Sequence, residues 1–182
     1  MAQAAFEIGL PLNAQLTVDI ARSIRVVKLS QAGRERMQAA RAVVVAALAD
    51  SETAHYGINT GFGALAEVPI APSQLSQLQL NLVRSHCTGV GPSLPREIVR
   101  LVMLLRAQVL AAGHSGARPI VVDTLVAMLN AGVHPVIPSQ GSVGASGDLA
   151  PLAHLALSTI GEGMAEFGGA LMPSRAALDM AG

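Results

Sequence analysis

The segment from Pro95 to Gly113 constrains the fold of this chain more than any other. Residues 98–105 are apolar at every position except Arg100, so a helix built from them is apolar on nearly all sides. Proline suits the first turn of a helix, glycine suits its end, and a helix of this kind needs protein around it. Because Arg100 and Arg106 interrupt the segment, it falls short of the roughly 20 apolar residues of a membrane span. We therefore predict a mainly α-helical protein without a membrane partner.

Other helices are predicted from apolar spacing and end signals. Ser30 is expected to cap a helix over residues 31–48, and Asp148 to cap one that holds Pro151 in its first turn. The pattern weakens after Gly161 without the sign of a finished domain, so we expect a piece of a longer chain. The remaining predicted elements are a helix from Pro72 to near Gly89, a helix from Pro119 that closes near Asn130 and Gly132, an extended piece over residues 133–138, and glycine-rich loops over residues 57–63 and 140–147.

Charge and composition exclude several kinds of partner. Twelve basic and twelve acidic residues balance without a basic stripe, and only 2% of residues are aromatic, so nucleic acid is not an expected partner. Only 13% of residues are charged and 51% are hydrophobic, which leaves too little polar surface for a small monomer. We expect a longer chain or an oligomer to cover part of this surface. The single cysteine, Cys87, and an N-terminus unlike a signal peptide indicate a cytoplasmic protein.

The most specific segment is the run Gly-Ser-Val-Gly-Ala-Ser-Gly-Asp, residues 141–148, which precedes a predicted helix. Exposed amides at a helix N-terminus attract anions, which would favour a phosphate-binding loop. However, no lysine follows the last glycine, and Asp148 places a negative charge where a phosphate would lie. Considered without any family, the run is the capped start of a helix.

Within this run, Ala145-Ser146-Gly147-Asp148 resembles the signature of the aromatic amino acid ammonia-lyases of the histidine ammonia-lyase type. The resemblance implies a cofactor formed autocatalytically from Ala145, Ser146 and Gly147, a 4-methylidene-imidazol-5-one, with Asp148 in support and no diffusible cofactor or metal. Ring closure joins the Gly147 amide nitrogen to the Ala145 carbonyl carbon, and Ser146 loses its hydroxyl as water. A residue without a Cβ at Gly147 permits this close approach.

The second segment is Tyr-Gly-Ile-Asn-Thr-Gly-Phe-Gly, residues 56–63, which contains the only tyrosine of the chain. On composition alone, Tyr56 is a rim residue with a solvated hydroxyl. The segment closely resembles a motif of the same family, which implies that Tyr56 is the catalytic base and that Asn59 and Gly63 support it. A phenol has a pKa of about 10, so removal of a β-proton at moderate pH requires nearby positive charge or hydrogen-bond donors.

The third segment, residues 81–91, contains the pair Ser85-His86. A histidine near a helix end is usually a hydrogen-bonded polar residue or a partner of the helix dipole. In the family that this chain resembles, the pair varies with the substrate, and Ser-His is similar to the histidine-specific members. The resemblance implies that His86 and Ser85 contact the substrate side chain, with L-histidine preferred over L-tyrosine. Cys87 is assigned no catalysis, and the remaining histidines lack metal-site spacing.

The resemblance covers essentially the whole chain and implies a helical ammonia-lyase fold, of which residues 1–182 are the N-terminal part. It also implies a homotetramer whose active sites draw residues from several subunits. The implied reaction removes ammonia from a small-molecule substrate, L-histidine, and gives urocanate. Gln108 is one departure, because the family more often has asparagine there; it leaves the local packing open and touches none of the three segments.

Two other hypotheses stay open on the sequence alone. The first keeps the chemistry and changes the substrate or the product, as in a tyrosine or phenylalanine ammonia-lyase or an aminomutase. The second belongs to another class, a non-catalytic helical assembly fragment whose glycine-rich loops are only turns. A lyase would show an ultraviolet absorbance beyond that of its side chains and would lose activity with borohydride, whereas an assembly fragment would show neither.

Overall fold

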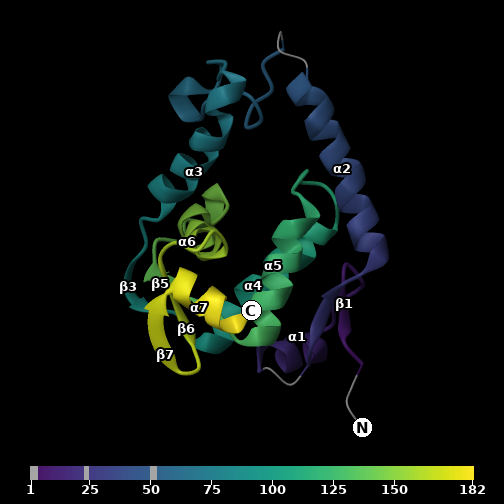
Figure 1. Cartoon of the computed structure of the whole chain (residues 1–182), viewed down its shortest axis with the longest axis vertical. Coiled ribbons are helices and arrows are strands. Elements are labelled where there is room, and N and C mark those ends of the chain that lie inside the picture. The colour runs from purple at the N-terminus through teal and green to yellow at the C-terminus, as the bar shows by residue number, and fades with distance from the viewer. Residues whose placement is uncertain (1–3, 23–24, 50–52) are drawn as a thin grey trace.

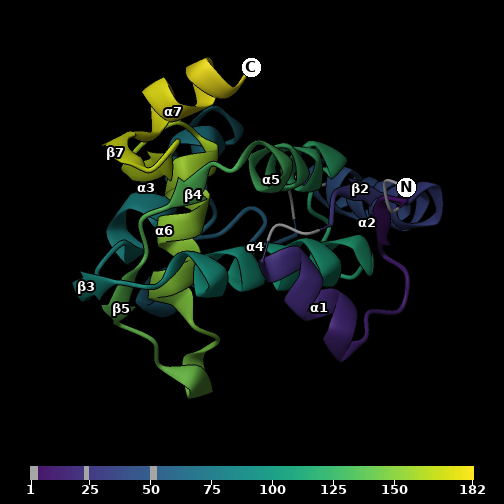
Figure 2. The same cartoon turned by 90° about the horizontal axis from the view of Figure 1, so that it is seen from below.

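The central element of the computed structural model is helix α4 (Arg96–Ala111), which begins directly after Pro95. The structure describes residues 4–22, 25–49 and 53–182. Helix α4 packs against α1 (Ala14–Ala21), α2 (Gln31–Ala49) and α5 (Pro119–Ala131), as Figures 1 and 2 show. Its buried face forms part of the hydrophobic core, and the buried residues of α4 are Val99, Arg100, Met103, Leu104, Ala107, Leu110 and Ala111.

One face of α4 carries exposed apolar side chains, as expected of a helix that a longer chain or an oligomer would cover. Ile98, Leu105 and Val109 are exposed, Val109 to 57%. Their spacing of seven and four residues places them on one stripe of the helix, opposite the face that contacts α1, α2 and α5. The described residues therefore leave an apolar stripe of α4 uncovered. None of the helices in the described ranges is long and apolar enough to cross a membrane.

The predicted helix ends are largely confirmed. Ser30 caps α2, because its hydroxyl accepts a hydrogen bond from the amide of Gly33 at 3.0 Å. Gly132 ends α5 in the left-handed conformation, with φ of 79°, which favours glycine. Pro72 opens a single 3₁₀ turn (Pro72–Gln74) that leads into α3 (Leu75–His86), and α6 (Leu149–Thr159) follows the second glycine-rich loop.

Short strands hold the ends of the helices together. β1 (Phe6–Ile8) pairs in parallel with β2 (Val27–Leu29), and β3 (Val90–Ser93) pairs antiparallel with β5 (Pro138–Gln140). A three-stranded antiparallel sheet has the order β4 (His134–Pro135), β6 (Met164–Phe167), β7 (Ala170–Pro173). The chain continues in α7 (Ser174–Ala181). The extended piece predicted over residues 133–138 is confirmed as β4 and the start of β5.

Arg100 is the one charged side chain in the core of the described residues, where it is 3% exposed. Its guanidinium donates to the carbonyls of Ile20 and Ala21 at the end of α1, and to that of Leu129 near the end of α5. The last carbonyls of a helix lack partners within the helix and carry partial negative charge. Two helix ends therefore satisfy the buried cation in place of a carboxylate.

His134 completes this buried polar cluster. Nη1 of Arg100 donates to its Nε2 at 3.1 Å, so Nε2 is unprotonated and the proton of the neutral ring lies on Nδ1. Burial, together with the positive charge of Arg100, lowers the pKa of His134 to about 4. The imidazole therefore stays neutral at ordinary pH and adds no second charge to the core.

Candidate active site

The loop of residues 141–148, which is called the electrophile loop after the role that the sequence predicts for it, joins β5 to α6 and projects from the fold (Figure 2). Its centre is a single 3₁₀ turn, Gly144–Ser146, in which both the amide and the hydroxyl of Ser146 donate to the carbonyl of Val143, at 2.7 and 2.8 Å. Gly147 follows with φ of 87°, and its amide donates to Gly144 at a long 3.4 Å. The tripeptide is therefore tightly turned, exposed and weakly tied at Gly147.

The turn fits the ring that the sequence predicts. Closure requires the Gly147 nitrogen to leave the Gly144 carbonyl and approach the carbonyl carbon of Ala145, and the 3.4 Å bond opposes this only slightly. The positive φ of Gly147 is one that L side chains rarely adopt. The Ser146 hydroxyl, which ring formation would remove as water, has the Val143 carbonyl as its one partner among the described residues.

Asp148 occupies the first position before α6, as predicted, but its side chain does not cap the helix. It accepts a hydrogen bond from the hydroxyl of Ser142 at the other end of the electrophile loop. Asp148 has φ of 55°, the one positive value outside glycine among the described residues. This left-handed backbone turns the carboxylate away from the α6 amides, so the contact with Ser142 closes the loop around the tripeptide.

The tyrosine loop, residues 56–63, is ordered by its own polar side chains. Asn59 accepts from the amide of His55 at 2.7 Å and donates to the carbonyl of Thr53 at 2.9 Å. Tyr56 is 66% exposed, and its ring meets that of Phe62 edge-on with centroids 5.8 Å apart. Gly63, with φ of 57°, starts a 3₁₀ turn that leads toward α3. The phenol of Tyr56 is therefore accessible from outside the loop.

His86 is the last residue of α3, and its Nδ1 lies 2.8 Å from the carbonyl of Leu82. A carbonyl can only accept, so Nδ1 carries the proton and Nε2 of the neutral ring is an acceptor. Ser85 supports the same arrangement, because its hydroxyl donates to Leu82 at 3.0 Å and lies 3.2 Å from Nδ1. The half-buried imidazole is therefore held in one orientation.

The segment that follows His86 lies against the start of the electrophile loop and against α6, whereas Tyr56 lies apart from both. The amide of Gly89 donates to Nε2 of His154 on α6 at 3.2 Å, and a Cβ on Gly141 would lie 3.0 Å from the Cα of Gly89. The tyrosine loop lies toward the other end of α3 (Figure 1), and Tyr56 makes no hydrogen bond to the electrophile loop within the described ranges. The sequence does not predict the role of His154, because its partner Gly89 lies 65 residues away and no local pattern links the two.

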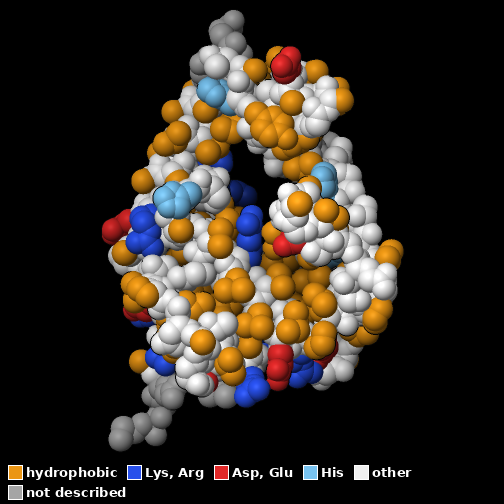
Figure 3. All heavy atoms as spheres, turned by 180° about the vertical axis from the view of Figure 1, so that it is seen from behind, with side chains coloured by type: hydrophobic (Ala, Val, Ile, Leu, Met, Phe, Trp, Pro, Cys, Tyr) orange, Lys and Arg blue, Asp and Glu red, His pale blue; other side chains and the backbone are white. Residues whose placement is uncertain are grey.

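A hollow of about 720 Å³ separates the tyrosine loop from the lower part of the fold. Ile58 lines it together with side chains from α2 and α3, among them Val44 and Val83, and with residues 115–118. Figure 3 shows the opening from behind, between the parts of the molecule that carry α2 and α3. Arg118, an exposed residue, borders this hollow, so it points to the open space and not to the core.

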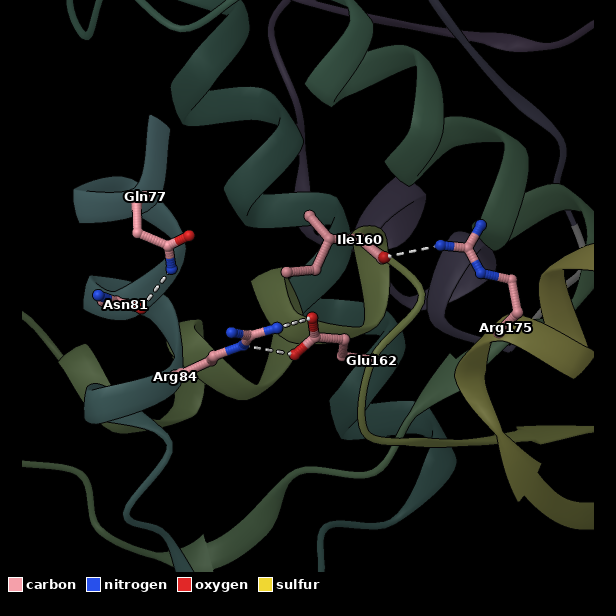
Figure 4. A network of polar contacts seen from close by, with 6 residues as sticks. All are labelled: Gln77, Asn81, Arg84, Ile160, Glu162 and Arg175. Atoms are coloured by element: carbon pink, nitrogen blue, oxygen red, sulfur yellow. Dashed lines mark hydrogen bonds and ion pairs between the residues drawn. The ribbon is translucent and has the colours of Figure 1, made fainter. Parts of the chain in front are cut away.

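A second contact joins the end of α3 to the turn that follows α6 (Figure 4). Arg84 donates two hydrogen bonds to the carboxylate of Glu162, at 2.9 and 2.5 Å, and these bonds lower the pKa of Glu162. Burial is the larger cause, and the negative charge of Glu162 the smaller cause, of a raised pKa of Cys87, which therefore stays a thiol. No three His, Cys, Asp or Glu side chains gather into a candidate metal site among the described residues.

A family model described as aromatic amino acid lyase matches residues 12–182. The chain therefore belongs to the aromatic amino acid lyase family. Within it, the chain is similar to a histidine ammonia-lyase of Sorangium cellulosum, with 55% identity over 177 residues, a match that covers 96% of this chain and 34% of that relative. The chain spans about a third of the length of the curated relatives it matches.

Solved structures agree with this membership. The ergothioneine-degrading enzyme ergothionase of Treponema denticola superimposes with a TM-score of 0.93 at 34% identity, covering 98% of this chain and 36% of that one. A histidine ammonia-lyase of Trypanosoma cruzi gives 0.87 at 37% identity, with 97% and 34% covered. The predicted helical ammonia-lyase fold is confirmed.

Proposed function

We propose that residues 1–182 form the N-terminal part of an ammonia-lyase that removes ammonia from L-histidine and releases urocanate. Similarity to a histidine ammonia-lyase over nearly the whole chain carries the proposal. The exposed Ala145-Ser146-Gly147 turn and the oriented imidazole of His86 support it, because one suits the family electrophile and the other suits an imidazole substrate. An imidazole nitrogen that bears hydrogen can donate to Nε2 of His86.

Each residue of the proposed site has a distinct task. A 4-methylidene-imidazol-5-one formed from Ala145, Ser146 and Gly147 would supply the electrophile that makes the substrate amine a leaving group, without a diffusible cofactor. Tyr56 takes the β-proton, the electrons of that C–H bond form the C=C bond, and the amine leaves with the electrons of the broken C–N bond. Asn59, Gly63 and Asp148 hold the backbone of the two loops.

We also propose that the protein acts in the cytoplasm as a homotetramer. The exposed stripe of α4 and the exposed Val43 and Val45 of α2 support association, because an apolar surface of this kind is stabilised by a protein cover. The lone Cys87, half-buried and without a disulfide, suits a reducing compartment. Light scattering on the full-length protein measures the oligomeric state directly.

The activity is tested by following urocanate through the ultraviolet absorbance of its conjugated side chain. We expect the full-length protein to convert L-histidine and to lose this activity after borohydride treatment, with much weaker turnover of L-tyrosine and L-phenylalanine. Untreated protein kept in buffer is the control for the borohydride step. A product derived from tyrosine or phenylalanine, or a β-amino acid in place of urocanate, would reject L-histidine elimination in favour of the other lyases or an aminomutase.

Exchanging the pair Ser85-His86 for His-Leu is expected to change the substrate preference. The change removes the acceptor Nε2 and the hydrogen bonds to Leu82, so the ratio of kcat/KM for histidine over tyrosine should fall by about tenfold or more. Ser85→Ala separates the two contributions, because His86 keeps its bond to Leu82 and the ratio should fall much less than in the double variant. An unchanged ratio in the double variant would place the selectivity elsewhere.

A further inference from the structure

His154 connects two parts of the proposed site that are distant in the sequence. It lies on α6, the helix that begins directly after the electrophile loop. Its Nε2 accepts a hydrogen bond from the backbone amide of Gly89 at 3.2 Å, across 65 residues of sequence. Gly89 follows His86 by three residues, so the contact joins the helix of the electrophile to the segment that carries the proposed substrate contact.

The segment between His86 and Gly89 couples the position of His86 to that of the Gly89 amide, because it is short and hydrogen-bonded. The amide of Thr88 donates to the carbonyl of His86 at 2.8 Å, and the thiol of Cys87 donates to the carbonyl of Val83 at 3.2 Å. Three residues with these contacts have few alternative conformations. Fixing the amide of Gly89 therefore limits where the end of α3 and the His86 imidazole can lie.

The backbone at this junction is packed too closely for side chains. A Cβ on Gly89 would lie 3.0 Å from Nε2 of His154 and 3.2 Å from the Cβ of Pro138. A Cβ on Gly141, the first residue of the electrophile loop, would lie 3.0 Å from the Cα of Gly89 and 3.3 Å from the Cβ of Ala150. Three segments therefore meet at Gly89: the end of α3, the start of the electrophile loop and the first turn of α6. The imidazole ring of His154 contacts this junction.

The chemistry of the contact requires one form of the imidazole. A backbone amide only donates, so Nε2 must be unprotonated and the ring must be neutral with its proton on Nδ1. Desolvation lowers the pKa of His154, which favours this neutral form. Leucine at this position would leave the Gly89 amide without its acceptor, whereas the side-chain oxygen of glutamine can take the place of Nε2.

We propose that His154 is a positioning residue, which holds the Gly89 amide and thereby sets His86 in register with the electrophile turn. This inference rests on the proposed function, in which His86 contacts the substrate. The Arg84–Glu162 pair ties α3 to the turn that follows α6, at a point two residues before His86, and α3 also packs directly on α6. Removing the His154 acceptor therefore leaves α3 attached to α6 and releases only the end that carries His86.

The test compares His154→Leu and His154→Gln in the full-length protein with the control His114→Leu, which changes an exposed histidine between α4 and α5. Hydrogen–deuterium exchange by mass spectrometry reports on residues 87–91 independently of activity. Peptide mass reports the ring, thermal unfolding reports the fold, and initial rates on L-histidine give kcat and KM separately. We expect His154→Leu to speed exchange at residues 87–91, form the ring as the wild type does, and lower kcat/KM about tenfold, mainly through KM.

His154→Gln should restore slow exchange and most of kcat/KM, and His114→Leu should match the wild type in every measurement. Equal impairment of the leucine and glutamine variants would overturn the proposal, since ring shape and not the acceptor would matter. Unchanged exchange and kcat/KM in His154→Leu would overturn it as well. If His154→Leu did not fold, the glutamine variant alone would decide, because the proposal predicts wild-type exchange and rates for it. Faster exchange or slower turnover in that variant would then overturn the proposal. A wild type without histidine turnover would reject the proposed function, whereas the exchange measurement would still report on the Gly89 contact.

Discussion

Ser146→Ala is expected to keep the fold and to remove nearly all ammonia-lyase activity from the full-length protein. The hydroxyl of Ser146 is exposed and, within the described part of the chain, donates only to Val143, so its loss should change the free energy of unfolding by about 1 kcal/mol or less. Without a hydroxyl to lose, no methylidene forms, and turnover should fall by at least about a thousandfold. Initial rates of urocanate formation and the unfolding transition measure the two effects.

The mass of the tripeptide separates this explanation from general damage to the loop. In the wild-type protein, the peptide that contains Ala145-Ser146-Gly147 should be lighter by two waters than its sequence predicts. The same peptide of Ser146→Ala should not show the loss of both waters. Ser142→Ala is the control, because it removes a hydroxyl from the same loop and its bond to Asp148 while leaving the ring atoms in place. It should keep the modified mass and activity within about tenfold of the wild type. An unmodified tripeptide in active wild-type protein would contradict the proposed electrophile.

Tyr56→Phe is expected to leave the ring chemistry and the fold intact and to slow turnover by about two to four orders of magnitude. The phenol hydroxyl makes no hydrogen bond within the described part of the chain, and phenylalanine keeps the edge-on contact with Phe62. The variant therefore removes the proton acceptor and little else. The decisive measurement is kcat for L-histidine, with the modified mass of the tripeptide as the check on the electrophile.

Phe62→Leu is the matched control for Tyr56→Phe. It removes the aromatic contact of Tyr56 and leaves the hydroxyl, so it should cost much less than the loss of the base. Wild-type turnover in Tyr56→Phe would show that Tyr56 packs within its loop and that another group takes the proton. Equal losses in both variants would mean that loop order, and not the hydroxyl, limits the reaction.

The sequence predicts the long elements well because their signals are local. Apolar spacing with Ser30, Pro119 and Gly132 at the ends defines α2 and α5 to within about a residue. The pairing of β1 with β2 and the hairpin of β6 and β7 were not predicted, because strands of three or four residues hold too little alternation. Their formation depends on packing against α4, α5 and α7.

The site shows the same division between local and distant information. The segments around Tyr56, His86 and Ser146 are found from the sequence because their residues are contiguous and resemble a family. The side chain of Asp148 is misjudged because its partner depends on a left-handed backbone that no residue type in the segment indicates. The contact of His154 with Gly89 is missed because it joins α6 to the segment after α3, which only the folded chain brings together.

The guanidinium of Arg100 limits how far the chain tolerates trimming from its N-terminus. Two of the three carbonyls that receive its hydrogen bonds belong to α1, at Ile20 and Ala21. A chain that starts after α1 would keep the cation on α4 with two of its four acceptors gone. A buried charge that loses its partners costs about 3 to 5 kcal/mol. Helix α1, which contains none of the proposed catalytic groups, therefore stabilises the core through the carbonyl groups that accept from the buried cation.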